Sequence, residues 1–244
     1  MITRRRFLGQ ALTACAVART GLAQVAAGVD PNLVALFADT HVTRRENSPF
    51  QRQGLARCVR EILALNPRPA QVILFGDLSC ATGEADDYAL LRELLAPLAA
   101  GGVRWHPVLG NHDNHAAFFA AFPEHAQTPV AGRMVSVVET PHAAFILLDS
   151  GLDGPVQGAL DEPQRAWLRE ALGQCVKPVF VGAHHPIKEL GIQALLAATP
   201  TCRGFLYGHN HAWNPDGARA VPSLCLPSTG HWGDIGFVLA RLGP

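Results

Sequence analysis

Five short polar clusters between Asp39 and His211 constrain the fold of this 244-residue chain more than any other feature. Each cluster stands at the end of an apolar run of strand-like composition, such as LVALFADTH or QVILFGD. Strand ends in an α/β sheet face a common edge, so clusters that are far apart in sequence can converge on one site. The clusters are Asp39-Thr40-His41, Gly76-Asp77, Gly110-Asn111-His112-Asp113, His184-His185 and Gly208-His209-Asn210-His211.

The side chains in these clusters are of the types that bind transition metals. Imidazoles are the usual nitrogen ligands of zinc, iron and manganese, a carboxylate can bridge two cations, and an amide oxygen adds a ligand without charge. Two carboxylates, one amide and four imidazoles exceed the needs of one tetrahedral zinc. They suffice for two adjacent cations, an arrangement typical of phosphoester cleavage. The candidate ligands are Asp39, His41, Asp77, Asn111, His184, His209 and His211.

The apolar pattern predicts alternating strands and helices from Leu33 onward, with strands predominating towards the C-terminus. This order indicates one mixed α/β domain over residues 33–244, built of two stacked mixed β-sheets flanked by helices. Helices are expected at residues 49–65, 84–98, 116–122, 162–172 and 190–198, and strands from Leu33 and at residues 71–75, 103–109, 134–139, 143–148, 178–182, 204–207, 218–226 and 235–242.

The distribution of charge argues against a polyanionic partner. The chain contains 20 Lys and Arg residues and 20 Asp and Glu residues. Four of the basic residues lie in the first 23 positions, which contain no acid, so the remainder carries four more acidic than basic side chains. Nucleic-acid binders concentrate Lys and Arg on one face, and the sequence indicates no such surface. The expected partner is a small phosphorylated substrate.

The N-terminus has the features of an export signal. Residues 3–8, TRRRFL, resemble the twin-arginine motif, and the apolar stretch Phe7–Ala18 is too short to span a bilayer. The small-residue sequence GLA that ends at Ala23 is an expected cleavage site, with a later VAA as the alternative. We therefore expect a signal peptide at residues 1–23, a linker at residues 24–32 and a periplasmic or secreted protein that meets the twin-arginine (Tat) export machinery transiently. A cytoplasmic protein with a basic tail is the alternative.

The cysteines bear on membrane attachment and on disulfides. The sequence LTAC ending at Cys15 resembles a lipobox, and lipidation of Cys15 would anchor the protein to a membrane. The other five cysteines form no C-x-x-C pair and no zinc-ribbon spacing. An exported protein could join two pairs of them, but the sequence leaves the connectivity open. Buried apolar packing is the expected role for most of them.

The five clusters match, in order, the five signature blocks of the calcineurin-like metallophosphoesterases. The resemblance runs from Leu33 to about Thr229 and includes the flanking segments GDLSCATGEADDYALLRELLAPL and GALDEPQRAWLREAL. It implies an α/β/β/α sandwich and a metal-dependent phosphoric ester hydrolase. It also implies two divalent or mixed-valence transition metal ions, which can be Mn, Fe or Zn.

Carried over by position, the family pattern divides the candidate ligands into two sets that share Asp77. One metal would be held by Asp39, His41, Asp77 and His211, and the other by Asp77, Asn111, His184 and His209. The resemblance implies that a metal-bridging hydroxide attacks phosphorus in line. It also makes His112 a catalytic residue that faces the scissile phosphate, with Asp113 orienting its ring. His185 would support the site or contact substrate.

The form of the motifs bears on the reaction. Purple acid phosphatases carry a tyrosine in a GD-x-x-Y block where this chain has Cys80, and this chain has His41 instead. The D-x-H form resembles the branch that contains cyclic-nucleotide and glycerophosphodiester phosphodiesterases. We therefore expect hydrolysis of a small phosphodiester. The alternatives are a phosphomonoesterase or nucleotidase that scavenges phosphate, and a non-catalytic binding or scaffold protein on the same fold.

The histidines outside the clusters receive no role in the expected site, because a single histidine in a globular chain rarely binds a metal. We expect ordinary loop packing for His231 and Trp232, and a position at the pocket mouth is the alternative. Surface or core positions are assigned to His106, His115, His125 and His142.

Overall fold

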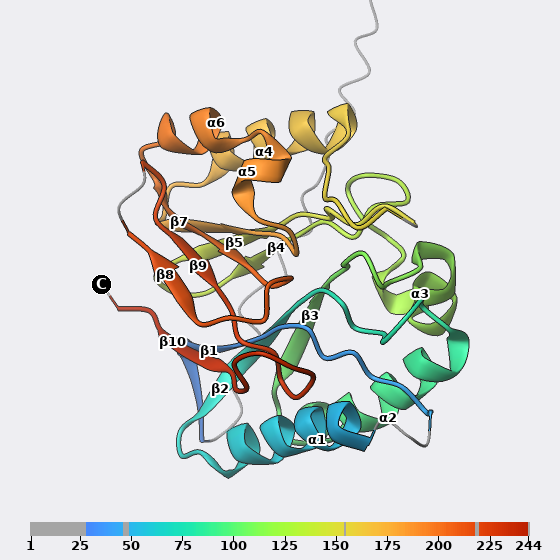
Figure 1. Cartoon of the computed structure of the whole chain (residues 1–244). Coiled ribbons are helices and arrows are strands. Elements are labelled where there is room, and N and C mark those ends of the chain that lie inside the picture. Colours follow the sequence, from blue (N-terminus) through green and yellow to red (C-terminus); the bar gives the residue numbers. More distant parts are fainter. Residues whose placement is uncertain (1–27, 46–48, 154, 218–219, 244) are drawn as a thin grey trace, which may run out of the picture.

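Two β-sheets lie face to face between two layers of helices, which confirms the predicted α/β sandwich (Figure 1). The computed structural model describes residues 28–45, 49–153, 155–217 and 220–243. The expected signal peptide and residues 24–27 of the expected linker lie outside these residues. Among the described helices, none is long and apolar enough to cross a membrane.

The first sheet has four strands in the order β10-β1-β2-β3. β1, β2 and β3 are parallel, and β10 pairs antiparallel with β1. Side chains alternate along β1, so that Val34 and Leu36 face the second sheet while Ala35 and Phe37 pack against helices. Both faces are covered, which explains why β1 ends in the continuous apolar run LVALF and β2 in VILF. The strands are Val29–Phe37 (β1), Arg68–Phe75 (β2), Arg104–Val108 (β3) and Val238–Arg241 (β10).

The second sheet has six strands in the order β4-β5-β6-β7-β9-β8. The four inner strands are parallel, and the edge strands β4 and β8 are antiparallel to their neighbours. Between the sheets, Ile73 and Phe75 of the first pack with Phe145 and Leu147 of the second in one buried cluster. The strands are Ser136–Glu139 (β4), Ala144–Leu147 (β5), Val179–Gly182 (β6), Cys202–Tyr207 (β7), Asn214–Asp216 (β8) and Ser223–Cys225 (β9).

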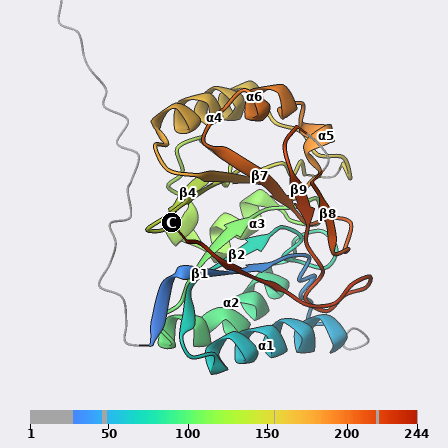
Figure 2. The same cartoon turned by 90° about the vertical axis from the view of Figure 1, so that its left-hand side faces the viewer.

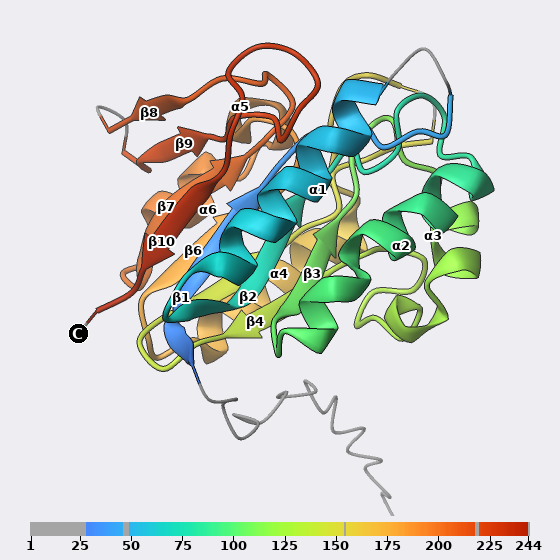
Figure 3. The same cartoon turned by 90° about the horizontal axis from the view of Figure 1, so that it is seen from below.

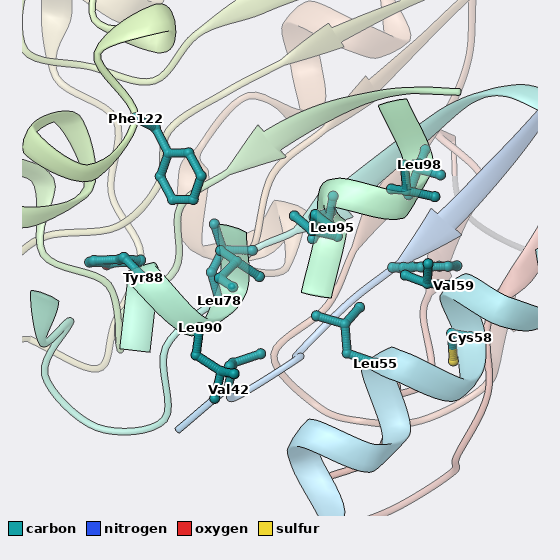
Figure 4. Close-up of a cluster of buried hydrophobic side chains, with 14 of the residues drawn as sticks. Val42, Leu55, Cys58, Val59, Leu78, Tyr88, Leu90, Leu95, Leu98 and Phe122 are labelled. Atoms are coloured by element: carbon teal, nitrogen blue, oxygen red, sulfur yellow. The ribbon is translucent and has the colours of Figure 1, made fainter. Parts of the chain in front are cut away.

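Helices α1, α2 and α3 cover the outer face of the first sheet, and α4, α5 and α6 cover the second (Figures 2 and 3). α1 buries Leu55, Val59 and Ile62, whose spacing of three or four residues places them on one face of the helix. Figure 4 shows Leu55 and Val59 beside Leu95 of α2 in this core. The helices are Pro49–Ala64 (α1), Ala85–Ala100 (α2), His115–Ala121 (α3), Glu162–Gln174 (α4), Ile187–Leu190 (α5) and Gln193–Ala197 (α6), with a 3₁₀ turn at Pro123–His125 (η1).

The start of β1 differs from the sequence-based prediction. β1 begins at Val29, so the prediction of a linker up to residue 32 was wrong for its last four residues. The cause is strand pairing: Val29 and Asp30 pair with Arg68 and Pro69 at the start of β2. A segment of mixed polarity can thus enter a sheet when a neighbouring strand offers free backbone groups.

Two further segments near the C-terminus also differ from the prediction. The single helix expected at residues 190–198 is the pair α5 and α6, because Gly191 between them has a left-handed φ of 63° that ends the first helix. The strand expected at residues 218–226 is the shorter β9, which forms antiparallel pairs with the unpredicted strand β8. Cys58, Cys80, Cys175, Cys202 and Cys225 are free in the described chain, and the first and last of them are buried.

Candidate metal centre

The polar clusters meet at the edge of the sandwich where the parallel strands of both sheets end. Parallel strands deliver their carboxyl ends to the same edge, which brings together loops that are distant in sequence. The loops are also joined to one another, since the Asp39 amide donates to the Gly76 carbonyl at 3.1 Å and the Gly208 amide to the His184 carbonyl at 3.1 Å. Asp39 and His41 follow β1, Asp77 follows β2, Asn111 follows β3, His184 follows β6, and His209 and His211 follow β7.

The first set of candidate ligands surrounds one point in the core of this edge. The ligand atoms of Asp39, His41, Asp77 and His211 all lie within 4.8 Å of one another, and all four residues are buried. Nε2 of His41 lies 3.5 Å from Oδ2 of Asp77 and 3.2 Å from Nε2 of His211. Nε2 of His211 lies 3.3 Å from Oδ1 of Asp39. The four donors are thus grouped as the ligands of one cation.

The second set lies on the other oxygen of Asp77. Nε2 of His184 is 3.2 Å from Oδ1 of Asp77 and 3.2 Å from Oδ1 of Asn111. Nδ1 of His209 lies 3.1 Å from Oδ1 of Asn111 and 3.2 Å from Nε2 of His184. A Cβ at Gly110 would fall 2.3 Å from Oδ1 of Asp77, so this close approach requires glycine. The carboxylate of Asp77 therefore faces both sets.

The free ring nitrogens of the candidate ligands are placed to bind cations, not to form hydrogen bonds. Nδ1 of His184 donates to the Phe75 carbonyl at 2.9 Å, and Nδ1 of His211 donates to the Trp232 carbonyl at 3.1 Å. A carbonyl can only accept, so Nε2 of each neutral ring is left as a bare lone pair aimed at the centre. Two ligands of one cation at about 2.0–2.2 Å lie roughly 3.0–3.5 Å apart, which is the spacing found here. The residues present therefore suit two divalent metal ions.

The pKa shifts of His41 and Asp77 favour the forms of these two side chains that bind metals. Burial lowers the pKa of His41 to about 3, although the charge of Asp77 opposes that change. Burial by itself would raise the pKa of Asp77, but the neighbouring His184 and His41 outweigh it and hold that pKa well below its ordinary value. A neutral imidazole and an ionised carboxylate are the forms that bind metals. At His184 burial alone would lower the pKa, but the charge of Asp77 outweighs it and raises that pKa to about 9.

The backbone is unusual at the candidate ligands. Five of the seven have positive φ, a left-handed conformation that non-glycine residues adopt rarely. Such conformations cluster at functional sites, where surrounding contacts hold them in place. The five residues and their φ angles are Asp39 (52°), His41 (43°), Asp77 (49°), His209 (68°) and His211 (49°).

His112 stands beside the donor sets. Its Nδ1 donates to the carbonyl of Ala81 at 2.9 Å, and its backbone amide donates to Oδ1 of Asp77 at 2.9 Å. Its ring lies against that of His41, with centroids 5.1 Å apart. With the Nδ1 proton engaged by Ala81, Nε2 is the nitrogen left for a substrate.

The expectation that Asp113 orients the ring of His112 was wrong, because Nδ1 of His112 donates to the carbonyl of Ala81 instead. The buried carboxylate of Asp113 instead accepts hydrogen bonds from four donors of 2.9–3.1 Å, and burial together with the charge of Asp77 raises its pKa to about 6. It joins the loop after β2 to the loop after β3, which carries Asn111 and His112. The donors are the amides of Leu78, Ser79 and Gly110 and the hydroxyl of Tyr88.

His231 and Trp232 lie against the candidate ligands, which the expectation of ordinary loop packing missed. The His231 ring is 4.3 Å from that of His41, centroid to centroid, and Nδ1 of His231 is 3.0 Å from Nε2 of Gln51. The Trp232 ring stacks on His211 at 4.1 Å. The one sequence signal was the polar string STGHWGD directly after an apolar segment, the same pattern as in the five clusters.

His185 supports the site but has no ring nitrogen free to bind a metal. It lies near His184 and His209, but its Nδ1 is bonded to Oγ of Ser150 at 2.9 Å and its Nε2 to the carbonyl of Val156 at 3.0 Å. Both ring nitrogens are therefore engaged. The ring fixes the loop that contains Val156 beside the donor sets, which agrees with the supporting role expected for it.

A second histidine network lies next to this loop. Nε2 of His115 is 2.8 Å from Oδ2 of Asp149, and Nδ1 of His115 is 2.8 Å from Oδ1 of Asp153. Burial alone would lower the pKa of His115, but the hydrogen bonds and charges of Asp149 and Asp153 outweigh it and raise that pKa to about 9. His115 is therefore a cation between two carboxylates at neutral pH. The prediction of a plain surface or core position did not include this network.

This network gives the stability of the protein a defined pH dependence. Because the folded pKa of His115 is raised above the ordinary 6.5 to about 9, its contribution is fully present below pH 6.5 and is lost as the pH rises through 9. We expect the difference in unfolding free energy between the wild type and His115→Gln to shrink by about 1–2 kcal/mol over this range, a value discounted for the exposure of Asp153. Urea unfolding of both proteins at pH 6, 7, 8, 9 and 10 measures it, and a difference that stays constant with pH would contradict it.

The sequence profile of the calcineurin-like phosphoesterases matches residues 33–213, which is most of the chain. The chain belongs to this family. It is 28% identical over 166 residues to the probable glycerophosphodiester phosphodiesterase GpdQ of Arcobacter nitrofigilis, and the match covers 66% of this chain and 59% of that protein. It is also 28% identical over 236 residues to the 3',5'-cyclic adenosine monophosphate phosphodiesterase CpdA of Pseudomonas aeruginosa, covering 87% of this chain and 82% of that protein.

Solved structures share the fold of this member of the calcineurin-like phosphoesterase family at low sequence identity. The purple acid phosphatase PPD1 of yellow lupin superposes with a TM-score of 0.60 at 12% identity, over 85% of this chain and 48% of that one. A 5'-nucleotidase of Staphylococcus aureus, described as putative, superposes with a TM-score of 0.51 at 13% identity, over 83% of this chain and 49% of that one. These likenesses concern the fold alone.

Proposed function

We propose that this protein is a binuclear-metal phosphodiesterase that hydrolyses a small phosphodiester. The observation that carries the proposal is the position of Asp77, whose Oδ1 and Oδ2 each face a different set of donor atoms 3.2–3.5 Å away. One bridging carboxylate between two such sets is the arrangement that two-metal hydrolases use to stabilise both the attacking and the leaving oxygen. Membership of the phosphoesterase family supports the same reaction class.

The roles of the side chains follow from their positions. One metal ion would be held by Asp39, His41, Asp77 and His211, and the other by Asp77, Asn111, His184 and His209. When bound, two such cations supply Lewis-acid polarisation of the phosphoryl oxygens and a water of lowered pKa. The chain itself contributes Nε2 of His112, which in the doubly protonated ring can donate a hydrogen bond to a phosphoryl oxygen or give a proton to the leaving oxygen.

A diester substrate has more support than a monoester. Two relatives with phosphodiesterase names match much of the chain, although the first of them is covered over only 59% of its length. The cavity next to His112 is lined, among the described residues, by no Lys or Arg that would bind the second negative charge of a monoester. A diester has one charge and two substituents, which suits a site that would hold cations at its base and has no basic side chain in the lining of this cavity.

The test is a paired assay on protein reconstituted with Mn. We expect turnover of bis-p-nitrophenyl phosphate to exceed that of p-nitrophenyl phosphate, and we expect Asn111→Ala to lose at least about 10²-fold of it, because one donor of the second set is removed. Asn214→Ala, an exposed asparagine on β8, is the matched control and should keep full activity. Turnover of the monoester alone would replace the proposal with a phosphomonoesterase, and no turnover with Mn, Fe or Zn would replace it with a binding protein.

A further inference from the structure

A small cavity of about 260 Å³ opens beside the candidate catalytic residue His112. Its lining includes Asn111 and His112 together with Thr82, Asp153 and Val156. Its volume lies below the roughly 300–1,000 Å³ of sites for drug-sized ligands, so it suits a small substituent of the substrate. Because it contains His112, it lies where the leaving group of a phosphodiester would stand.

The lining of this cavity includes one exposed carboxylate, that of Asp153. Its side chain is 53% exposed, and its Oδ1 accepts from Nδ1 of His115 at 2.8 Å and from the His115 amide at 3.3 Å. Oδ2 of Asp153 has no hydrogen-bond partner among the residues that the structure describes. This carboxylate is therefore fixed through one oxygen, while the other can accept a hydrogen bond from a ligand.

The anchor of Asp153 reaches the core of the protein. His115, whose side chain is 12% exposed, also binds Asp149, which is fully buried. Oδ2 of Asp149 accepts from the Met134 amide at 2.8 Å, and its own amide donates to Oε1 of Gln164 at 3.1 Å. An exposed ion pair contributes about 0–1 kcal/mol to stability and needs no such support. The chain Asp149–His115–Asp153 instead holds one carboxylate in a fixed place at the cavity wall.

We propose that Asp153 determines specificity by accepting a hydrogen bond from a hydroxyl of the leaving alcohol, and that His115 is its positioning residue. The inference rests on the proposed phosphodiesterase function. A carboxylate accepts from hydroxyl groups and repels anions, so the cavity takes a small polyol and disfavours a leaving group that carries a further phosphate. Thr82 is a further hydroxyl-bearing residue of the cavity lining.

The decisive experiment compares two diesters on the Mn-loaded protein. Diglycerol phosphate carries hydroxyl groups on both arms, and bis-p-nitrophenyl phosphate carries none. For Asp153→Asn we expect kcat/KM for diglycerol phosphate to fall about 10-fold or more, the value of a hydrogen bond to a charged group, while kcat/KM for bis-p-nitrophenyl phosphate changes less than about 2-fold. Glu162→Gln removes an exposed carboxylate on α4 and should leave both values unchanged.

The positioning role of His115 has its own readout. His115→Gln should reduce the preference for diglycerol phosphate in the same direction as Asp153→Asn, and the double variant should be no worse than Asp153→Asn alone, because both changes act through one contact. Calorimetric binding of glycerol 3-phosphate against methyl phosphate gives the same comparison without turnover, and Asp153→Asn should remove the preference for the glycerol compound.

The outcomes separate this inference from the proposed function. If the wild type hydrolyses both diesters but Asp153→Asn changes them equally, Asp153 has only a structural role and the inference is overturned. If the wild type hydrolyses neither diester, the proposed function fails first, and equal binding of the two monophosphates by the wild type and Asp153→Asn then overturns the inference as well.

Discussion

Replacing Asp77 by asparagine is expected to lower phosphodiester turnover by about 10³-fold or more. Both carboxylate oxygens of Asp77 face donor atoms, Oδ2 towards His41 at 3.5 Å and Oδ1 towards His184 at 3.2 Å. An amide keeps one oxygen and puts an NH₂ group, which cannot bind a cation, towards the other set. We therefore expect loss of at least one metal ion per chain together with loss of turnover.

Two measurements on the same preparations test this. Metal content by inductively coupled plasma mass spectrometry should fall from two ions to one or none, and kcat for bis-p-nitrophenyl phosphate should fall in parallel. Asp86→Asn makes the same chemical change at an exposed position in the first turn of α2 and should keep both values. An Asp77→Asn protein that retains two metals and more than about a tenth of wild-type turnover would show that Asp77 does not bridge the sets.

Asp113→Ala is expected to be the most destabilising single substitution near the site. The carboxylate accepts from three backbone amides and from the hydroxyl of Tyr88, all buried. A buried donor that loses its partner costs about 1–3 kcal/mol, whereas removing a carboxylate whose pKa is raised to about 6 by burial and by Asp77 returns part of that cost. We expect a net loss of at least about 3 kcal/mol and a fall in Tm of about 6–12 °C.

Urea and thermal unfolding measure this loss of stability, and Asp161→Ala serves as the comparison variant. Asp161 caps α4 by accepting from the Gln164 amide at 3.0 Å and pairs with Arg133, so its removal should cost about 1–2 kcal/mol. If Asp113→Ala costs no more than Asp161→Ala, the four hydrogen bonds of Asp113 do not hold the two loops together. Asp113 would then not position His112 through the joined loops.

The parts of the site that the sequence could predict are those that follow from strand ends. A polar residue after a buried strand is recognisable in one dimension, and parallel strands fix which edge it reaches. This is why the positions of Asp39, Asp77 and Asn111 could be inferred without coordinates. The division of the ligands into two sets came from family resemblance, and the distances about Asp77 agree with it.

The parts that the sequence could not predict depend on loop geometry and on backbone groups. His231 reaches His41 from a loop 190 positions later in the chain, and its place depends on the close packing of that loop on α1. The partners of Asp113 are mostly amides, which every residue carries and no sequence pattern marks. The same holds for the carbonyl of Ala81, which positions His112.

The left-handed backbone at five of the candidate ligands lowers the folding stability of the protein. A non-glycine residue in that conformation costs of order 1–3 kcal/mol, although Asp and His tolerate it better than most. Glycine at any of the five positions would relieve strain and abolish a ligand at once. Folding stability alone therefore gives no reason for non-glycine residues at these five positions, whereas a metal centre does.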